Sequence, residues 1–184
     1  MSESSPIKDV LYSEIDRIGQ NQIHELLLKN RFSDIFKEIF EKAIIKIDED
    51  ISVEEKYGAL AESMTHYLFT EMLVPSQRKI LYENIELDLI IPNTLELKKS
   101  SENTIIVFFV KTNNTDEIKN RISEIKTIQE NNDNVWIISK YSMDITQRIY
   151  LTTSQSFTKF LEDAQNFIHS KKMNKLNIFK TKMG

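Results

Sequence analysis

The feature that most constrains the fold is a strand–helix–strand pattern in the second half of the 184-residue chain. Residues 105–110 read IIVFFV, a continuous β-branched and aromatic run that is typical of a strand covered on both faces. Residues 115–129 carry isoleucines at helical spacing, and residues 135–139 read VWIIS, which indicates a second buried strand. This order predicts a parallel strand pair joined by a right-handed crossover.

Further predicted strands surround this unit. Residues 79–82 and 85–91 are expected to form an antiparallel meander with the strand at 105–110. A short strand at 149–152 and a helix at 156–168 complete the pattern. The sequence therefore predicts an α/β fold, with a mixed central sheet flanked by helices.

The first part of the chain is predicted to be helical. One apolar stripe at helical spacing begins at Ile7, and a second runs from Phe32 to Ile47. Ser52 and Glu55 match a capping box, which places the start of a helix over residues 53–72. We therefore divide the chain into an N-terminal helical extension, an α/β domain and a basic C-terminal tail, at residues 1–51, 52–168 and 169–184.

Charge and composition limit the possible functions. The net charge is −4, but residues 169–184 contain five lysines and no acid, which leaves 24 − 5 = 19 basic against 28 acidic residues in the rest. An acidic body does not suit broad binding to phosphate backbones, so we expect nucleic-acid contacts to use the tail. These candidate residues are Lys171, Lys172, Lys175, Lys180 and Lys182. The alternative is a solvated terminus.

Cysteine is absent, which excludes a disulfide framework and a thiolate zinc site. No window approaches 18 apolar residues, and the N-terminus lacks the apolar segment of a secretory signal. We therefore expect no membrane span and a cytoplasmic location.

A few polar residues fall on these elements in a meaningful order. Glu62 lies in the predicted helix before the sheet, Asp88 lies in the strand ELDLIIP, and Lys111 follows the strand IIVFFV. These positions and the element order resemble the PD-(D/E)xK nuclease superfamily, whose fold is restriction-endonuclease-like, and most closely its archaeal Holliday-junction-resolvase-like members. The resemblance covers residues 57–168.

The resemblance implies that Glu62, Asp88 and Lys111 are catalytic residues and that Mg²⁺ is the cofactor. In this family the aspartate and an acid two residues before the lysine hold the ion, which prefers oxygen ligands. Here that second position is Phe109, on the same strand face as Lys111, and it supplies no oxygen. Glu86 points to the same face as Asp88 and could compensate, so the candidate metal ligands are Asp88, Glu62 and Glu86.

A literal acid–x–lysine motif also occurs at Glu96-Leu97-Lys98. It lies only eight residues after Asp88, in a polar segment, and we interpret it as a solvated hairpin arm. It is therefore not a candidate for the missing acid.

Three functions remain open. The first is a nuclease-like domain with a degenerate metal site that binds DNA, RNA or a protein without cutting. The second is an active Mg²⁺-dependent nuclease with a rearranged carboxylate site. The third is a helical module in which residues 7–47 dock onto a protein partner. Nuclease relatives are often dimers, so the resemblance also implies a possible homodimer.

Overall fold

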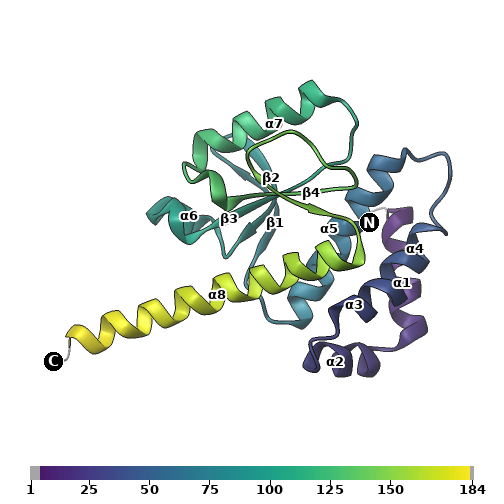
Figure 1. Ribbon diagram of the computed structural model, residues 1–184, viewed down its shortest axis with the longest axis horizontal. Helices are drawn as coiled ribbons and strands as arrows, with labels where there is room; N and C mark the ends of the chain where they lie inside the picture. Colours follow the sequence, from purple (N-terminus) through teal and green to yellow (C-terminus); the bar gives the residue numbers. More distant parts are fainter. Residues whose placement is uncertain (1–4, 183–184) are drawn as a thin grey trace.

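The computed structural model describes the backbone of residues 5–182 and the side chains of residues 5–172. In the described residues, six helical elements precede the sheet, and they lie where the two apolar stripes and the capping box predict helical structure. Figure 1 shows these helices beside the sheet. The Ser52 hydroxyl accepts a hydrogen bond from the backbone N–H of Glu55, which confirms the predicted helix start. The elements are α1 (Pro6–Ile18), α2 (Gln20–Leu28), α3 (Phe32–Ile35), the π-helical η1 (Phe36–Glu41), α4 (Lys42–Ile44) and α5 (Val53–Glu71).

Within residues 5–182, the sheet has five strands in the spatial order β1-β2-β3-β4-β5. The first three strands pair antiparallel, whereas β3, β4 and β5 pair parallel, so the sheet is mixed as predicted. The strands are β1 (Gln77–Tyr82), β2 (Ile85–Ile91), β3 (Ile105–Phe109), β4 (Val135–Ser139) and β5 (Arg148–Leu151). The connecting and closing helices are α6 (Thr94–Lys99), η2 (Ser101–Asn103), α7 (Thr115–Ile128), η3 (Asn132–Asn134) and α8 (Ser154–Lys182).

Helices cover both faces of this sheet, which explains why β3 is apolar along its whole length. Val107 and Phe109 of β3 belong to a core shared with the N-terminal helices, α5 and α8. Ile106 belongs to a second core with the apolar stripe of α7, which includes Ile122 and Ile125. Successive side chains of a strand alternate between its faces, so a strand buried on both faces must be apolar throughout.

The N-terminal helices are part of the main core. Phe36 stacks on Phe40 with ring centroids 4.6 Å apart, and it also contacts Phe157 of α8 at 5.4 Å. Ile7 and Ile47, near the two ends of the predicted stripes, are both buried in this core. These stripes are therefore part of the core of the chain itself, so docking onto a partner, which stays a prediction, would have to use the apolar side chains that residues 7–47 leave exposed, such as Leu28 and Ile45.

Two local predictions are wrong. The segment containing Glu96 and Lys98 is helix α6 and not a hairpin arm, because the Asn93 side chain caps it by accepting a hydrogen bond from the N–H of Glu96. The last helix begins at Ser154 and continues beyond Ile168 to Lys182, so the described part of the basic tail is helical.

Figure 1 shows that the C-terminal end of α8 extends away from the other elements. Lys171 and Lys172 lie on this part of the helix. The side chains of three candidate residues lie outside the described ones, namely those of Lys175, Lys180 and Lys182. Within the described residues, no helix has the length and apolar character needed to cross a membrane.

Candidate functional site

Three elements bring the predicted catalytic residues together. Glu62 lies on α5 and Asp88 lies on β2, while Lys111 follows the neighbouring strand β3 by two residues. Gly58 lies one turn before Glu62 and allows α5 to approach the end of β3 closely. A methyl group at Gly58 would lie 2.2 Å from the carbonyl oxygen of Val110. The absence of a side chain here therefore permits the close approach of α5 that brings Glu62 to Lys111.

Glu62 is buried, with 3% of its side chain exposed, and each of its oxygens accepts from a cation. Oε2 accepts from Lys111 Nζ at 2.6 Å, and Oε1 accepts from Arg78 Nε at 3.1 Å. Burial raises the pKa of this carboxyl, but the hydrogen bond and charge of Lys111 and the charges of Arg78 and Lys79 outweigh burial. The net pKa lies below its usual value, so Glu62 is ionised at neutral pH.

Asp88 is in a different electrostatic state. Its Oδ2 accepts a hydrogen bond from the backbone N–H of Phe109 at 2.9 Å. Burial raises the pKa of this carboxyl above its usual value, and the nearby Glu62 charge adds to the effect. Lys111, the Phe109 N–H and Arg121 offset it only in part. Two carboxyls that share the neighbouring cation Lys111 thus have pKa values shifted in opposite directions.

Phe109 provides no side-chain ligand for a metal ion at the position where the resemblance expects an acid. The residue is 1% exposed, and its side chain belongs to the core between the sheet and α5. Only its backbone N–H faces a candidate ligand, Asp88. The sequence correctly placed Phe109 and Lys111 on one side of the sheet, since α5 contributes both to the core around Phe109 and to the ion pair of Lys111.

Glu86 is exposed, and its backbone carbonyl accepts a hydrogen bond from Arg121 of α7. In the part of the chain with described side chains, no group of three or more histidine, aspartate or glutamate residues could hold a metal ion. Because Glu62 is occupied by Lys111 and Arg78, the donor set of this site does not fit Mg²⁺, which needs several free oxygen ligands.

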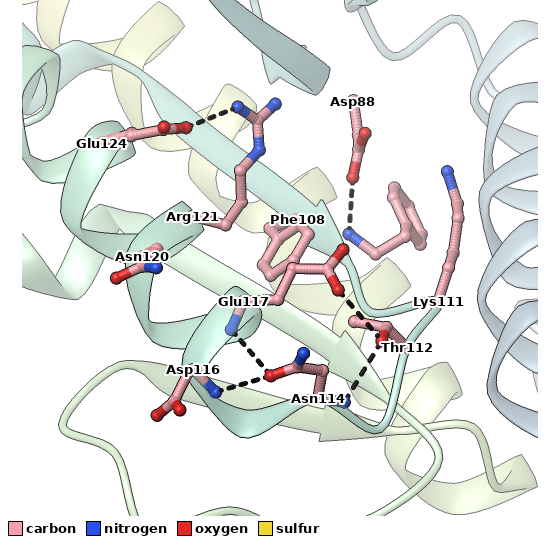
Figure 2. Close-up of a pocket in the computed structure, with 11 residues that line it drawn as sticks. Asp88, Phe108, Lys111, Thr112, Asn114, Asp116, Glu117, Asn120, Arg121 and Glu124 are labelled. Carbon is pink, nitrogen blue, oxygen red and sulfur yellow. Dashed lines mark hydrogen bonds and ion pairs between the residues drawn. The ribbon is translucent and has the colours of Figure 1, made fainter.

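A cavity of about 570 Å³ opens beside Asp88 and Lys111 (Figure 2). The start of α7 forms much of its wall: Glu117 Oε2 accepts from the Thr112 hydroxyl at 3.3 Å, and Arg121 pairs with Glu124. The lining residues are Asp88, Phe108, Phe109, Lys111, Thr112, Asn114, Asp116, Glu117, Asn120, Arg121 and Glu124. The cavity therefore combines charged side chains of both signs with the apolar surface of Phe108 and Phe109.

Sequence reasoning missed Arg78, the second partner of Glu62. Arg78 lies on β1, where it pairs with Leu89, the residue after Asp88. An arginine in an otherwise ordinary edge strand is a weak signal, and only the β1–β2 register reveals its proximity to the site.

Comparisons of the chain with protein-family models, with curated proteins and with solved structures found no match. The likeness to the PD-(D/E)xK superfamily thus rests on the residues and element order given above.

Proposed function

We propose that this chain is a nuclease-like domain with a degenerate metal site, which binds nucleic acid without cutting it. The state of Glu62 is the observation that carries the proposal. Glu62 occupies the position where the resemblance expects a helix glutamate, yet Lys111 and Arg78 bind both of its oxygens. Its helix and the end of β3 hold this carboxylate as an ion-pair partner rather than as a metal ligand.

Local charge supports binding to phosphate. Lys111, Arg78 and Lys79 all act on Glu62, so this corner of the site has three cations against Glu62 and Asp88, and the pKa of Asp88 is raised. The α7 wall of the cavity carries Asp116, Glu117 and Glu124 against Arg121, so a phosphate would approach from the side of Lys79 and Lys111. Lys79 is exposed, and Lys111 is 34% exposed at the edge of the open cavity. Cationic side chains beside a cleft attract phosphate even when the rest of the surface is acidic.

An active nuclease is the second candidate, and the meeting of Glu62, Asp88 and Lys111 favours it. Activity would require Glu62 to leave Arg78 and Lys111 and to turn toward an ion beside Asp88. It would also require a third oxygen ligand, for which Glu86 is the candidate from the sequence. Glu117, which lines the cavity with Asp88, is the candidate from the structure.

Fluorescence anisotropy with duplex DNA, branched DNA and RNA at two salt concentrations tests the binding. We expect affinity to fall as salt rises, and Lys79→Gln to reduce the slope of log K against log salt by about 1. Lys37→Gln, on η1 and far along the chain from the site, is the control and should leave the slope unchanged. An affinity that changes neither with salt concentration nor in the Lys79→Gln variant would refute nucleic-acid recognition at this site.

A cleavage assay separates the two candidates. With Mg²⁺ or Mn²⁺ present, we expect the native chain to leave plasmid and branched DNA intact. Metal-dependent cleavage that Asp88→Asn abolishes would establish the active nuclease instead. A cytoplasmic location, a homodimer and a protein partner stay predictions.

A further inference from the structure

A second cavity, of about 350 Å³, lies at the carboxyl ends of the parallel strands β3 and β4. Its wall includes Val110 after β3, Thr115 at the start of α7, residues 139–145 at the end of β4 and beyond, and Glu54 at the start of α5. The linings of the two cavities have Thr112 in common. Small ligands of α/β proteins bind outside the carboxyl ends of parallel strands, in cavities of about 300–1,000 Å³.

Part of this lining is apolar. Val110, Ile118, Met143 and Ile145 contribute aliphatic surface. Tyr141 also lines the cavity and is 53% exposed, so part of its ring is free to pack on a ligand. Such a surface suits an apolar or aromatic molecular body.

Ser139 supplies a buried hydrogen-bond donor. The residue is 3% exposed, and its Oγ accepts a hydrogen bond from the backbone N–H of Tyr141 at 3.2 Å. Among the residues with described side chains, none accepts the proton of this hydroxyl. A buried hydroxyl normally uses its proton, so Ser139 is able to donate to a ligand in the cavity.

The neighbouring Lys140 adds a positive charge. Its Nζ lies 3.8 Å from the centroid of the Tyr57 ring and 5.5 Å from that of Tyr141, a cation–π arrangement. Lys119 of α7 also lines the cavity. Within the described side chains, no carboxylate lies within 4.0 Å of either lysine ammonium, so both charges are available to an anion.

Other groups limit which anion fits. The Asn114 side chain already accepts from the N–H groups of Asp116 and Glu117, so the first turn of α7 is capped and side chains must recognise the anion. Glu54 and Asp144 also line the cavity and repel a polyanion such as a nucleic-acid backbone. A single anionic group beside Ser139 and Lys140 avoids this repulsion.

We propose that this cavity binds a small amphiphilic anion, in which an apolar or aromatic body carries one carboxylate or phosphate group. The anion accepts from the Ser139 hydroxyl and the Lys140 ammonium, while the body packs on the aliphatic surface and on Tyr141. This site does not depend on the nuclease-like function proposed above, because it uses different side chains.

An NMR titration of the full chain tests the proposal, with backbone amide shifts as the readout. Phenylacetate and phenyl phosphate are the probes for the two anion types, benzyl alcohol is the uncharged body, and acetate is the anion without a body. We expect saturable shifts around residues 110–118 and 139–145 with at least one aromatic anion. Benzyl alcohol and acetate should bind about tenfold more weakly, because benzyl alcohol lacks the anionic group and acetate lacks the aromatic body.

Two substitutions locate the anion contact. Lys140→Met and Ser139→Ala should each weaken binding of the aromatic anion about tenfold, since each removes one hydrogen bond to a charged group. Lys126→Met, in the last turn of α7, is the matched control and should bind like the native chain. The amide spectra of the variants show whether each remains folded.

Three outcomes would overturn the proposal. The first is the absence of saturable shifts with either aromatic anion at concentrations up to about 10 mM. A dissociation constant above this concentration would be too weak for a specific ligand. The second is acetate binding as tightly as the aromatic anions. The third is a folded Lys140→Met variant with unchanged affinity.

Discussion

Replacing Gly58 with alanine tests how the packing of α5 creates the candidate site. The added methyl group would lie 2.2 Å from the Val110 carbonyl oxygen, 2.9 Å from the Val110 carbonyl carbon and 2.8 Å from Lys111 Cγ. The lysine side chain can move aside, but the backbone of Val110 cannot. Relief therefore requires α5 and the end of β3 to separate, and these elements carry Glu62 and Lys111.

The expected loss of stability follows from two opposing effects. Overpacking a well-packed contact costs about 3 kcal/mol at the upper end of its usual range. Alanine in place of glycine inside a helix returns about 1 kcal/mol. The net loss is then about 2 kcal/mol, or about 4–8 °C in melting temperature for a chain of this size.

Urea denaturation of the native and Gly58→Ala chains measures this difference. The double variant Gly58→Ala/Lys111→Ala, compared with Lys111→Ala, is the internal control. The loss should persist in that background, because the Val110 carbonyl oxygen is the closer atom. A Gly58→Ala chain as stable as the native one, or more stable, would refute the close approach of α5 to β3.

Three further predictions concern the charged residues. Glu62→Gln should cost about 2 kcal/mol at pH 7, because it leaves Lys111 and Arg78 without their carboxylate, whereas Glu49→Gln, at an exposed position between α4 and α5, should have no measurable effect. The pKa of Glu62 is lowered in the folded chain, so ionised Glu62 stabilises the fold at pH values above the ordinary glutamate pKa of 4.5. This stabilisation is lost as the pH falls through the lower, folded pKa. The free energies of unfolding of the native and Glu62→Gln chains should therefore converge in acid. Asp88→Asn should be as stable as the native chain or more stable at pH 7. The pKa of Asp88 is raised in the folded chain, so at pH values above the ordinary aspartate pKa of 3.8 the ionisation of Asp88 opposes folding. A clear loss of stability in Asp88→Asn would contradict the raised pKa. Replacing the five lysines at the end of α8 with glutamine should weaken nucleic-acid binding and flatten its salt dependence, as measured by fluorescence anisotropy. The five residues are Lys171, Lys172, Lys175, Lys180 and Lys182. Unchanged binding would show that this end of the helix is not part of the interface.

The sequence predicted most of the fold because its strands differ clearly from its helices. The strands at 85–91 and 135–139 were predicted to the residue, since β-branched runs flanked by polar turns have few alternatives. The end of α8 was misjudged because the apolar stripe stops near Ile168. The residues that follow include no glycine or proline before the last position, so no residue there ends the helix. Apolar periodicity indicates which face of a helix is buried, and a helix that projects from the rest of the chain has no buried face to produce this pattern.

The candidate site was predictable only in outline. The order of elements indicated that Glu62, Asp88 and Lys111 would meet, and the structure brings them together. The sequence did not indicate that Lys111 would bind Glu62 directly or that Arg78 would complete the pair. Those contacts depend on the β1–β2 register and on the height of α5 above the sheet, which the sequence pattern does not specify.

A Mn²⁺ titration of the native chain tests the central claim most directly, because bound Mn²⁺ broadens NMR signals of nearby nuclei. The site lacks a free pair of carboxylates, since Glu62 is bound by Lys111 and Arg78 and position 109 is a buried phenylalanine. We therefore predict no saturable broadening of the amide signals of Phe109 and Lys111 at Mn²⁺ concentrations below about 1 mM, where functional metal sites are filled. Saturable broadening centred on these amides at micromolar Mn²⁺, and its loss in Asp88→Asn, would contradict the account and identify a working metal site.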